Sequence, residues 1–302
     1  MSHQIKEEKK VSTYFTYGVG TTETAQKTVK FTVQTLMNKC SKNLDFFNDM
    51  HFYVIDDCKT IPKASIFTRV VKCGKNNYSG VTMNPLGNHN KKEIVILTNN
   101  TSNFIRKLYN PRLMDTLSPT DTKNTTLHEI GHLFDAYFGE KPSADVINAS
   151  ENWEENVELF EKIVEYLKTS ELSDSEEFKQ AYTKDIENLL MRSDCDVLRE
   201  DLNYFSPDYF IQDGKGGIDI SDGVTREEID DAEFERAEVF AESFAYNLGA
   251  DSIEFNEEIF RTVYKNCINV VKKYISEFLN IKPETMEASM VYTGLKTASD
   301  TP

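Results

Sequence analysis

Residues 128–132 read His-Glu-Ile-Gly-His, a spacing that can bind a metal ion and activate water. On a helix, residues four apart share a face, so His128 and His132 can both bind one ion. Glu129 lies about 100° further round the helix, from where its carboxylate can reach a water on that ion. Neutral imidazole suits Zn²⁺, and three protein ligands leave a fourth position open for water. The motif therefore predicts zinc-dependent hydrolysis with Glu129 as general base.

Glu129 also has a purely structural interpretation. Thr126-Leu127-His128-Glu129 has the T-x-x-E form of a capping box, in which the glutamate closes the start of a helix. Against this, Gly131 interrupts the predicted helix, and an interior glycine is tolerated where a ligand or another backbone approaches closely. Asp135 follows His132 by three residues on the same face, where it can orient a ligand imidazole by accepting its second N–H.

The third zinc ligand has to be an acidic residue, because no histidine follows His132 at ligand spacing. Glu238 and Glu242 are four residues apart on a predicted helix, so one can bind the metal while the other supports a histidine. Spacing alone leaves a solvated acidic helix edge as an equal alternative for this pair. Three acids nearer to His132 in sequence remain candidate ligands: Glu151, Glu154 and Glu155.

The N-terminal half of the chain alternates between helix and strand signals. Thr21 or Thr22 can cap a helix whose apolar positions continue to Cys40. Turn residues then separate short β-prone segments. The predicted strands are 51–55, 66–71, 78–83 and 94–97.

The C-terminal half is almost entirely helical. A helix begins near Asn124, after Pro111 and Pro119, and carries the His-Glu-Ile-Gly-His motif. Later helices follow apolar stripes over 157–167, 178–190, 234–248 and 259–274. This order predicts an α+β fold with a small β-sheet. We expect one domain over 13–281, with loose ends at 1–12 and 282–302.

Composition and charge exclude several classes of protein. The 302 residues are 39% hydrophobic and 28% charged, as in globular proteins, and no apolar run is long enough for a membrane span. The N-terminus lacks the apolar stretch of a signal peptide, which predicts a chain that is cytoplasmic as made. Residues 151–260 contain 32 of the 50 acidic and 9 of the 34 basic residues. Such a segment repels phosphate, so nucleic acid is not an expected partner.

The five cysteines do not form a recognisable metal or disulfide pattern. Their number is odd and none are spaced as C-x-x-C, which argues against a thiolate zinc site and a disulfide framework. Cys40 and Cys267 fall on apolar helical stripes, so we expect them to be buried thiols.

The two motifs together resemble the zinc peptidase domain of anthrax lethal factor and the related Pro-Pro endopeptidases. The similar segments are His128–Asp135, which matches H-E-x-G-H-x-x-D, and Ala237–Phe244, which is similar to A-E-[FY]-F-A-E-[AS]-F except that Val239 replaces the aromatic residue. Residues 173–182 also resemble an intervening segment of some relatives, and the similarity covers about 80–248. The resemblance implies a gluzincin: a zincin-like, Zn²⁺-dependent metalloendopeptidase. It further implies that Glu238 binds the metal and that Glu242 supports a ligand.

Two departures from that family bear on substrate and mechanism. The interval of 105 residues between His132 and Glu238 is far longer than in those relatives, which implies an acidic helical insertion at about 139–225. Those relatives also have a tyrosine seven residues before the glutamate ligand, thought to steady the oxyanion, whereas this chain has Asp231 there. The candidates to replace that tyrosine are Tyr204, Tyr209 and Tyr246.

We therefore expect an endopeptidase that hydrolyses peptide bonds of a protein or peptide substrate. An extended substrate would add to a sheet edge, and Ser79–Thr82 or Ile94–Leu97 is the candidate edge strand. Two alternatives remain: a catalytically degenerate zincin-like protein acting as a binding module, and a zinc hydrolase of another substrate class. The resemblance to a toxin family adds two expected routes out of the cell, namely delivery into another cell and export by a non-classical route.

Overall fold

The structure is a computed structural model that describes nine stretches of the chain. They are residues 12–18, 21–40, 43–55, 80–83, 92–97, 119–138, 171–191, 232–249 and 257–279. Several predicted features lie outside these stretches, namely the strand at 66–71, the helix at 157–167, both predicted loose ends except residue 12, and most of the 139–225 insertion.

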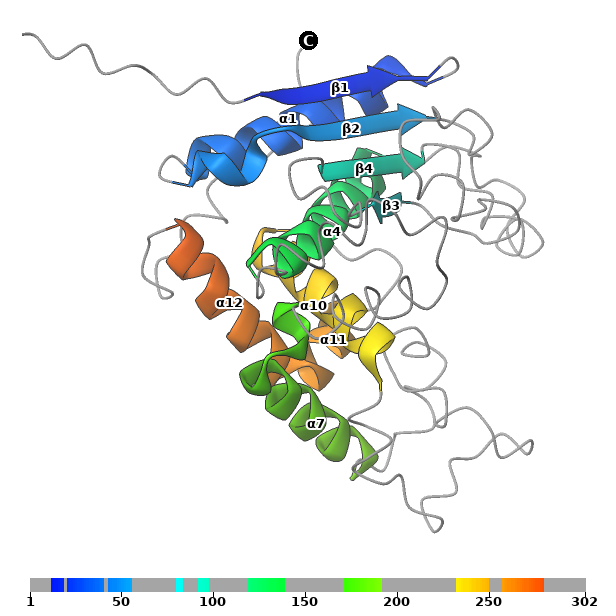
Figure 1. The fold of residues 1–302 in the computed structure, drawn as a ribbon. Coiled ribbons are helices and arrows are strands. Elements are labelled where there is room, and N and C mark those ends of the chain that lie inside the picture. The colour runs from blue at the N-terminus through cyan, green and yellow to red at the C-terminus, as the bar shows by residue number, and fades with distance from the viewer. Residues whose placement is uncertain are drawn as a thin grey trace, which may run out of the picture.

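A small sheet lies at one side of the molecule (Figure 1). Its strands are β1 (Thr13–Tyr17), β2 (Met50–Ile55), β3 (Gly80–Met83) and β4 (Lys92–Leu97), in the order β1-β2-β4-β3. The first three strands in that order are parallel, and β3 pairs antiparallel with β4. The fold is thus mixed helix and strand and mostly helical, which is consistent with the predicted α+β class. Among the described strands β3 is at one end of the sheet, whereas β4 is interior.

β1 is a strand that the sequence analysis missed. Its five residues, Thr-Tyr-Phe-Thr-Tyr, are all β-branched or aromatic, which is the composition that favours strands. The segment is short and follows a charged N-terminus, so its β signal is confined to five residues. Pairing of Thr13 with Met50 and of Tyr17 with Val54 places it beside β2.

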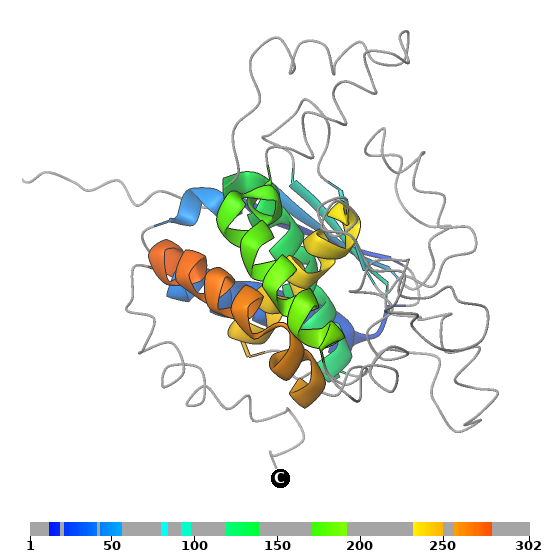
Figure 2. The ribbon, with the colours of Figure 1, turned by 90° about the horizontal axis from the view of Figure 1, so that it is seen from below.

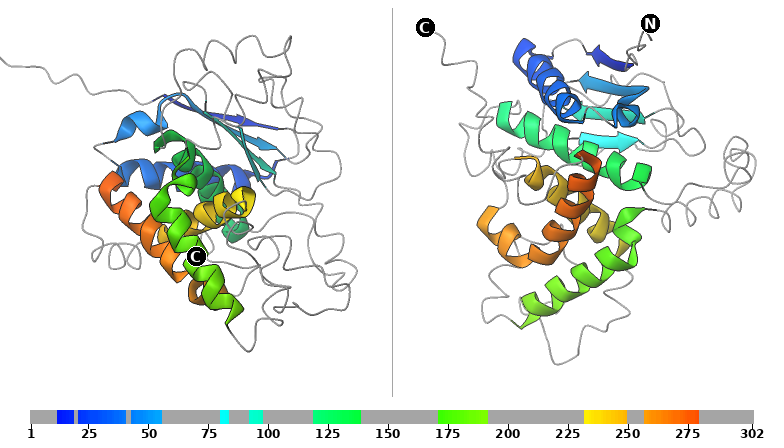
Figure 3. Two further views of the ribbon diagram at one scale, coloured as in Figure 1. Left: turned by 60° about the horizontal axis from the view of Figure 1, so that its bottom comes forward. Right: turned by 90° about the vertical axis from the view of Figure 1, so that its left-hand side faces the viewer.

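Helices cover one face of this sheet in successive layers. They are α1 (Glu23–Lys39), α4 (Pro119–Phe138), α7 (Glu176–Leu190), α10 (Glu233–Asn247), α11 (Glu257–Val263) and α12 (Lys265–Leu279), with short 3-10 turns η1 (Leu44–Phe47) and η4 (Leu172–Asp174). α4 contacts β3, β4 and α1 on one side and α10 on the other (Figure 3). α10 in turn packs against α12, and α12 lies beside α7 (Figure 2). α4 is therefore the central helix between the sheet and the C-terminal helices.

One hydrophobic core runs through these layers. Phe134 of α4 lies near its centre, with its ring centroid 5.9 Å from Phe46, 5.0 Å from Phe244 and 5.2 Å from Phe278. The predicted core thiols Cys40 and Cys267 are both buried and free. None of the described helices is long and apolar enough to cross a membrane.

Two of the described helices begin at a side-chain cap, and the sequence predicted the first of them. Thr22 caps α1 by accepting the N–H of Ala25 at 3.2 Å, as one of the two predicted caps. Ser175 caps α7 in the same way, through the N–H of Phe178.

The predicted start of α4 near Asn124 is wrong, because α4 begins at Pro119. Proline is favoured at the first helical position, where its missing N–H costs no hydrogen bond and its φ angle already suits a helix. Pro119, which the sequence analysis assigned to the preceding loop, is therefore the first residue of the helix.

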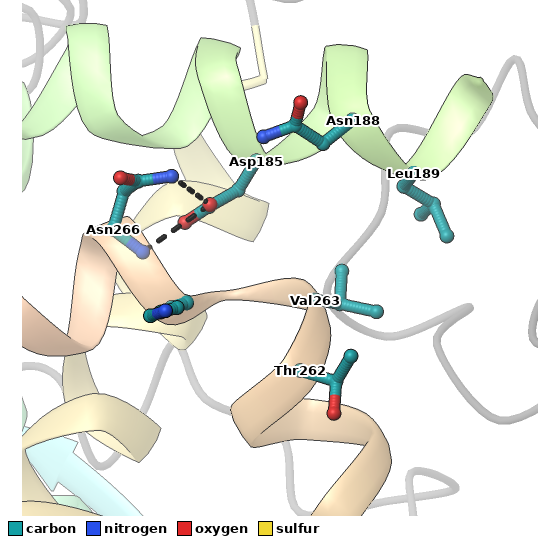
Figure 4. A pocket seen from close by; sticks show the side chains of 7 residues that line it. Asp185, Asn188, Leu189, Thr262, Val263 and Asn266 are labelled. Atoms are coloured by element: carbon teal, nitrogen blue, oxygen red, sulfur yellow. Dashed lines mark hydrogen bonds between the residues drawn. The ribbon is translucent and has the colours of Figure 1, made fainter. Parts of the chain in front are cut away.

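The predicted single helix over 259–274 is two helices, α11 and α12, which are separated at Tyr264. The carboxylate of Asp185, from α7, accepts the backbone N–H of Asn266 at 3.2 Å and of Cys267 at 2.9 Å. These amides are in the first turn of α12 and have no intrahelical partner. Asp185 thus caps α12 from another helix, beside a pocket between α7 and the α11–α12 junction (Figure 4).

Candidate metal centre

The two histidines of the motif lie on the same face of α4, in the middle of a 20-residue helix. Thr126 is also inside this helix, where its hydroxyl donates to the carbonyl oxygen of Thr122 at 2.6 Å. A residue in that position cannot be an N-cap, because an N-cap precedes the first turn. The capping-box interpretation of Glu129 is therefore wrong.

Gly131 brings α10 close to α4. A Cβ atom at this position would lie 2.9 Å from both Cα and the carbonyl oxygen of Ala241, and 3.1 Å from Cβ of Phe244. Ala241 and Phe244 belong to α10, so the backbones of α4 and α10 approach closely at Gly131. This close approach requires a glycine at position 131. The sequence analysis had suggested a close approach of this kind as the reason for a glycine inside the helix.

We expect Gly131→Ala to push α4 and α10 apart. The overlap with backbone atoms costs about 1–3 kcal/mol, against a gain of about 1 kcal/mol in helix propensity. Because the metal ligands come from both helices, we expect zinc affinity to fall at least roughly tenfold, as for other losses of ligand support. Isothermal titration calorimetry measures the affinity directly.

Gly249→Ala provides the matched control for that substitution. Gly249 has a φ angle of +83° at the end of α10, and no atom of the described residues lies within 4 Å of a Cβ built there. An alanine there is strained through its backbone alone, at a cost of about 1 kcal/mol. Its zinc affinity should stay unchanged, and an equal loss in both variants would contradict the close-approach explanation.

Three side chains from the two helices converge on one point. Nε2 of His128 lies 3.2 Å from Nε2 of His132 and 3.1 Å from Oε2 of Glu238. Nε2 of His132 lies 3.6 Å from the same Oε2, so the three atoms form a donor triangle. A tetrahedral ion with ligands at 2.0–2.1 Å would hold its donor atoms about 3.3 Å apart. The donor set, two imidazoles and a carboxylate, can hold a metal ion and is one that Zn²⁺ accepts.

Glu242 occupies the supporting position that the sequence suggested. Its Oε2 lies 3.1 Å from Nδ1 of His128, on the ring side opposite to Nε2. An ionised carboxylate only accepts hydrogen bonds, so Nδ1 carries the proton. This contact fixes the orientation of the ring and leaves Nε2 directed at the metal position.

The charges of the cluster stabilise one another. Burial alone would lower the pKa of His128, but its hydrogen bonds to Glu238 and Glu242 raise the pKa well above its usual value. Burial alone would raise the pKa of Glu238, and the neighbouring His132 and His128 instead hold it well below its usual range. A metal ion at this point would take over the role of the imidazolium proton on Nε2 of His128.

Asp135 is buried behind the second histidine, with only 1% of its surface exposed. Its Oδ1 accepts the backbone N–H of Ser173 at 2.7 Å, while Oδ2 has no hydrogen-bond partner within the described parts of the chain. Burial raises the pKa of this carboxyl to about 7, partly offset by hydrogen bonds from Ser173 and by the nearby His132. A free buried oxygen near His132 suits the predicted role of orienting its imidazole.

Glu129 is buried beside the cluster, with 6% of its surface exposed. It follows His128 directly on α4 and is therefore displaced round the helix from the face that holds the two histidines. Its carboxylate does not belong to the group of three donor residues.

Of the other candidate residues from the sequence, only Tyr246 lies within the described stretches, and it does not join this cluster. Tyr246 is half-buried and packs against the hydrophobic core, and it forms no hydrogen bond with the described residues of the cluster. The remaining candidates lie outside the described residues: Glu151, Glu154, Glu155, Tyr204, Tyr209 and Asp231.

An ion pair behind the site was missed by the sequence analysis. Arg236, two residues before Glu238, is 1% exposed and donates from Nη2 to Oδ1 of Asp174 at 2.7 Å. The partners are 62 residues apart, and helical arginines are usually solvated, so no sequence pattern marks the pair.

Comparison of this chain with protein-family models, with curated proteins and with solved structures gives no match.

Proposed function

We propose that this protein is a zinc-dependent endopeptidase of the zincin-like type. The observation that carries the proposal is the donor triangle of His128, His132 and Glu238, whose sides of 3.1–3.6 Å suit a tetrahedral ion. These residues would hold Zn²⁺, which when bound lowers the pKa of water and polarises a carbonyl group.

A side chain of the protein would then transfer the proton from the attacking water to the leaving amine. The carboxylate of Glu129 accepts a proton from the attacking water and donates it to the nitrogen of the leaving amine. Glu242 keeps the proton of His128 on Nδ1, so that Nε2 stays directed at the metal position.

The sheet offers a place for the substrate backbone. β3 is at the end of the described sheet and contacts α4, the helix that carries Glu129. An extended peptide that hydrogen-bonds to this strand would lie alongside the metal site. The alternative edge, Ile94–Leu97, is excluded because β4 lies between β2 and β3.

Zinc content and a mixed peptide library together test this function. We expect about one equivalent of zinc per chain, cleavage of library peptides, and loss of cleavage after chelation with recovery on zinc addition. Mass spectrometry of the products identifies the cleaved bonds. Zinc binding without cleavage would instead support a binding module, and hydrolysis only of non-peptide esters or amides would support a different zinc hydrolase.

A further inference from the structure

The short turn Glu171–Ser175, which includes η4, contacts both helices that carry the metal ligands. The backbone N–H of Ser173 donates to Oδ1 of Asp135 on α4 at 2.7 Å. The next residue, Asp174, accepts from Nη2 of Arg236 on α10 at 2.7 Å. Two consecutive residues of one turn thus hold two helices that are distant in sequence.

Both side chains of the ion pair are buried, so the pair is favourable only while its two partners stay in contact. The side chain of Asp174 is 8% exposed and that of Arg236 is 1% exposed. A buried ion pair adds little net stability compared with apolar packing, but it strongly penalises any arrangement in which its partners separate. The pair therefore specifies the position of α10 relative to the turn more than it stabilises the fold.

The anchored residues are close to the metal ligands along each helix. Arg236 precedes Glu238 by two residues, which places them about 200° apart around α10. Fixing the guanidinium on one side of the helix thereby fixes the rotation that directs the Glu238 carboxylate on the other. Asp135 follows His132 by about one helical turn, and Ser173 holds its Oδ1, while its Oδ2 has no hydrogen-bond partner among the described residues.

We propose that the turn Glu171–Ser175 is a clamp that sets the spacing of the metal ligands, with Asp174 and Arg236 as positioning residues for Glu238. Ser173 holds α4 through Asp135, one helical turn after His132. This inference rests on the proposed metal site and assigns a role to part of the segment that separates the two motifs. The clamp joins α4 and α10 at a point away from the Gly131–Ala241 contact, so the two helices are held at two places.

Asp174→Asn tests the clamp with little change in shape, because it removes the charge but retains an acceptor oxygen. We expect its zinc affinity, measured by competition with a chromophoric chelator, to fall about 10–100-fold, the range for groups that orient ligands. The visible spectrum of the Co²⁺-substituted protein should also change, since it reports ligand geometry.

Asp185→Asn is the matched control. Asp185 is another buried aspartate, 1% exposed, that accepts hydrogen bonds across helices, but it caps α12 and contacts neither metal-binding helix through them. We expect a similar loss of thermal stability in the metal-free protein but wild-type zinc affinity and Co²⁺ spectrum. Equal zinc affinity in wild type, Asp174→Asn and Asp185→Asn would overturn the clamp while leaving the metal site intact. A wild-type protein that bound no zinc would overturn both.

Hydrogen exchange on the unmodified protein gives a second measurement, which does not depend on the folding of a variant. Coupling free energies are reciprocal, so a turn that organises the ligands must itself be stabilised when zinc binds. We expect the Ser173 amide to exchange more slowly after zinc addition, while the Cys267 amide, capped by Asp185, does not change. Equal slowing at both amides would show general stabilisation and overturn the clamp.

Discussion

Glu129→Gln should bind close to one equivalent of zinc and lose about 10²–10⁴-fold in peptide turnover, the usual contribution of a general base. The substituted amide has nearly the shape of the carboxylate but cannot accept a proton at neutral pH. Glu129 is outside the donor triangle of His128, His132 and Glu238, so the metal should remain. Zinc content and initial rates of cleavage of a peptide selected from the library measure the two effects separately.

Glu187→Gln is a suitable control, because Glu187 is an exposed residue of α7. It should leave both zinc content and turnover unchanged. Near-normal turnover in Glu129→Gln would remove Glu129 from the mechanism. Loss of zinc together with turnover would instead make this carboxylate a metal ligand.

Glu238→Ala should release zinc far more readily than any other single acidic substitution. Its Oε2 is one of the three donor atoms, whereas Glu242 contacts only the Nδ1 of His128. Loss of a supporting group usually weakens metal binding about 10–100-fold, and loss of a direct ligand should exceed that range. We expect the affinity order wild type, Glu242→Ala, Glu238→Ala, from tightest to weakest.

Glu154→Ala completes this series, because Glu154 is a ligand candidate that sequence proximity alone suggested. It should bind zinc as tightly as wild type. If Glu154→Ala released zinc most readily, the intervening segment would supply the ligand, and the pairing of Glu238 with the histidines would have another purpose. A crystal structure with zinc would show which carboxylate lies about 2.0–2.2 Å from the metal.

Much of the metal centre was predictable because helical spacing is a local property. His128 and His132 share a face wherever the segment is helical, and Glu238 and Glu242 do so on their own helix. The caps Thr22 and Ser175 are local in the same sense, since each accepts an N–H three residues ahead. For such features the chain carries the whole signal in a few neighbouring residues.

Contacts between segments that are distant in the sequence were harder to predict from the sequence alone. Spacing left Glu238 as an equal choice between a ligand and a solvated helix edge, and only the packing of α10 on α4 places its Oε2 3.1 Å from His128. The same packing explains Gly131, whose missing Cβ makes the contact with Ala241 possible. These contacts depend on how two helices cross, which no single segment specifies.

The sequence by itself determined the donor types, their helical spacing and the α+β class, because these depend on composition and local periodicity. Only the tertiary structure decided where α12 begins and how the metal-binding helices are held. Asp185 divides the predicted last helix by capping amides 81 and 82 residues away. Asp174 reaches Arg236 across 62 residues. Buried polar groups must find partners, but the chain's folded path determines which partners lie within reach.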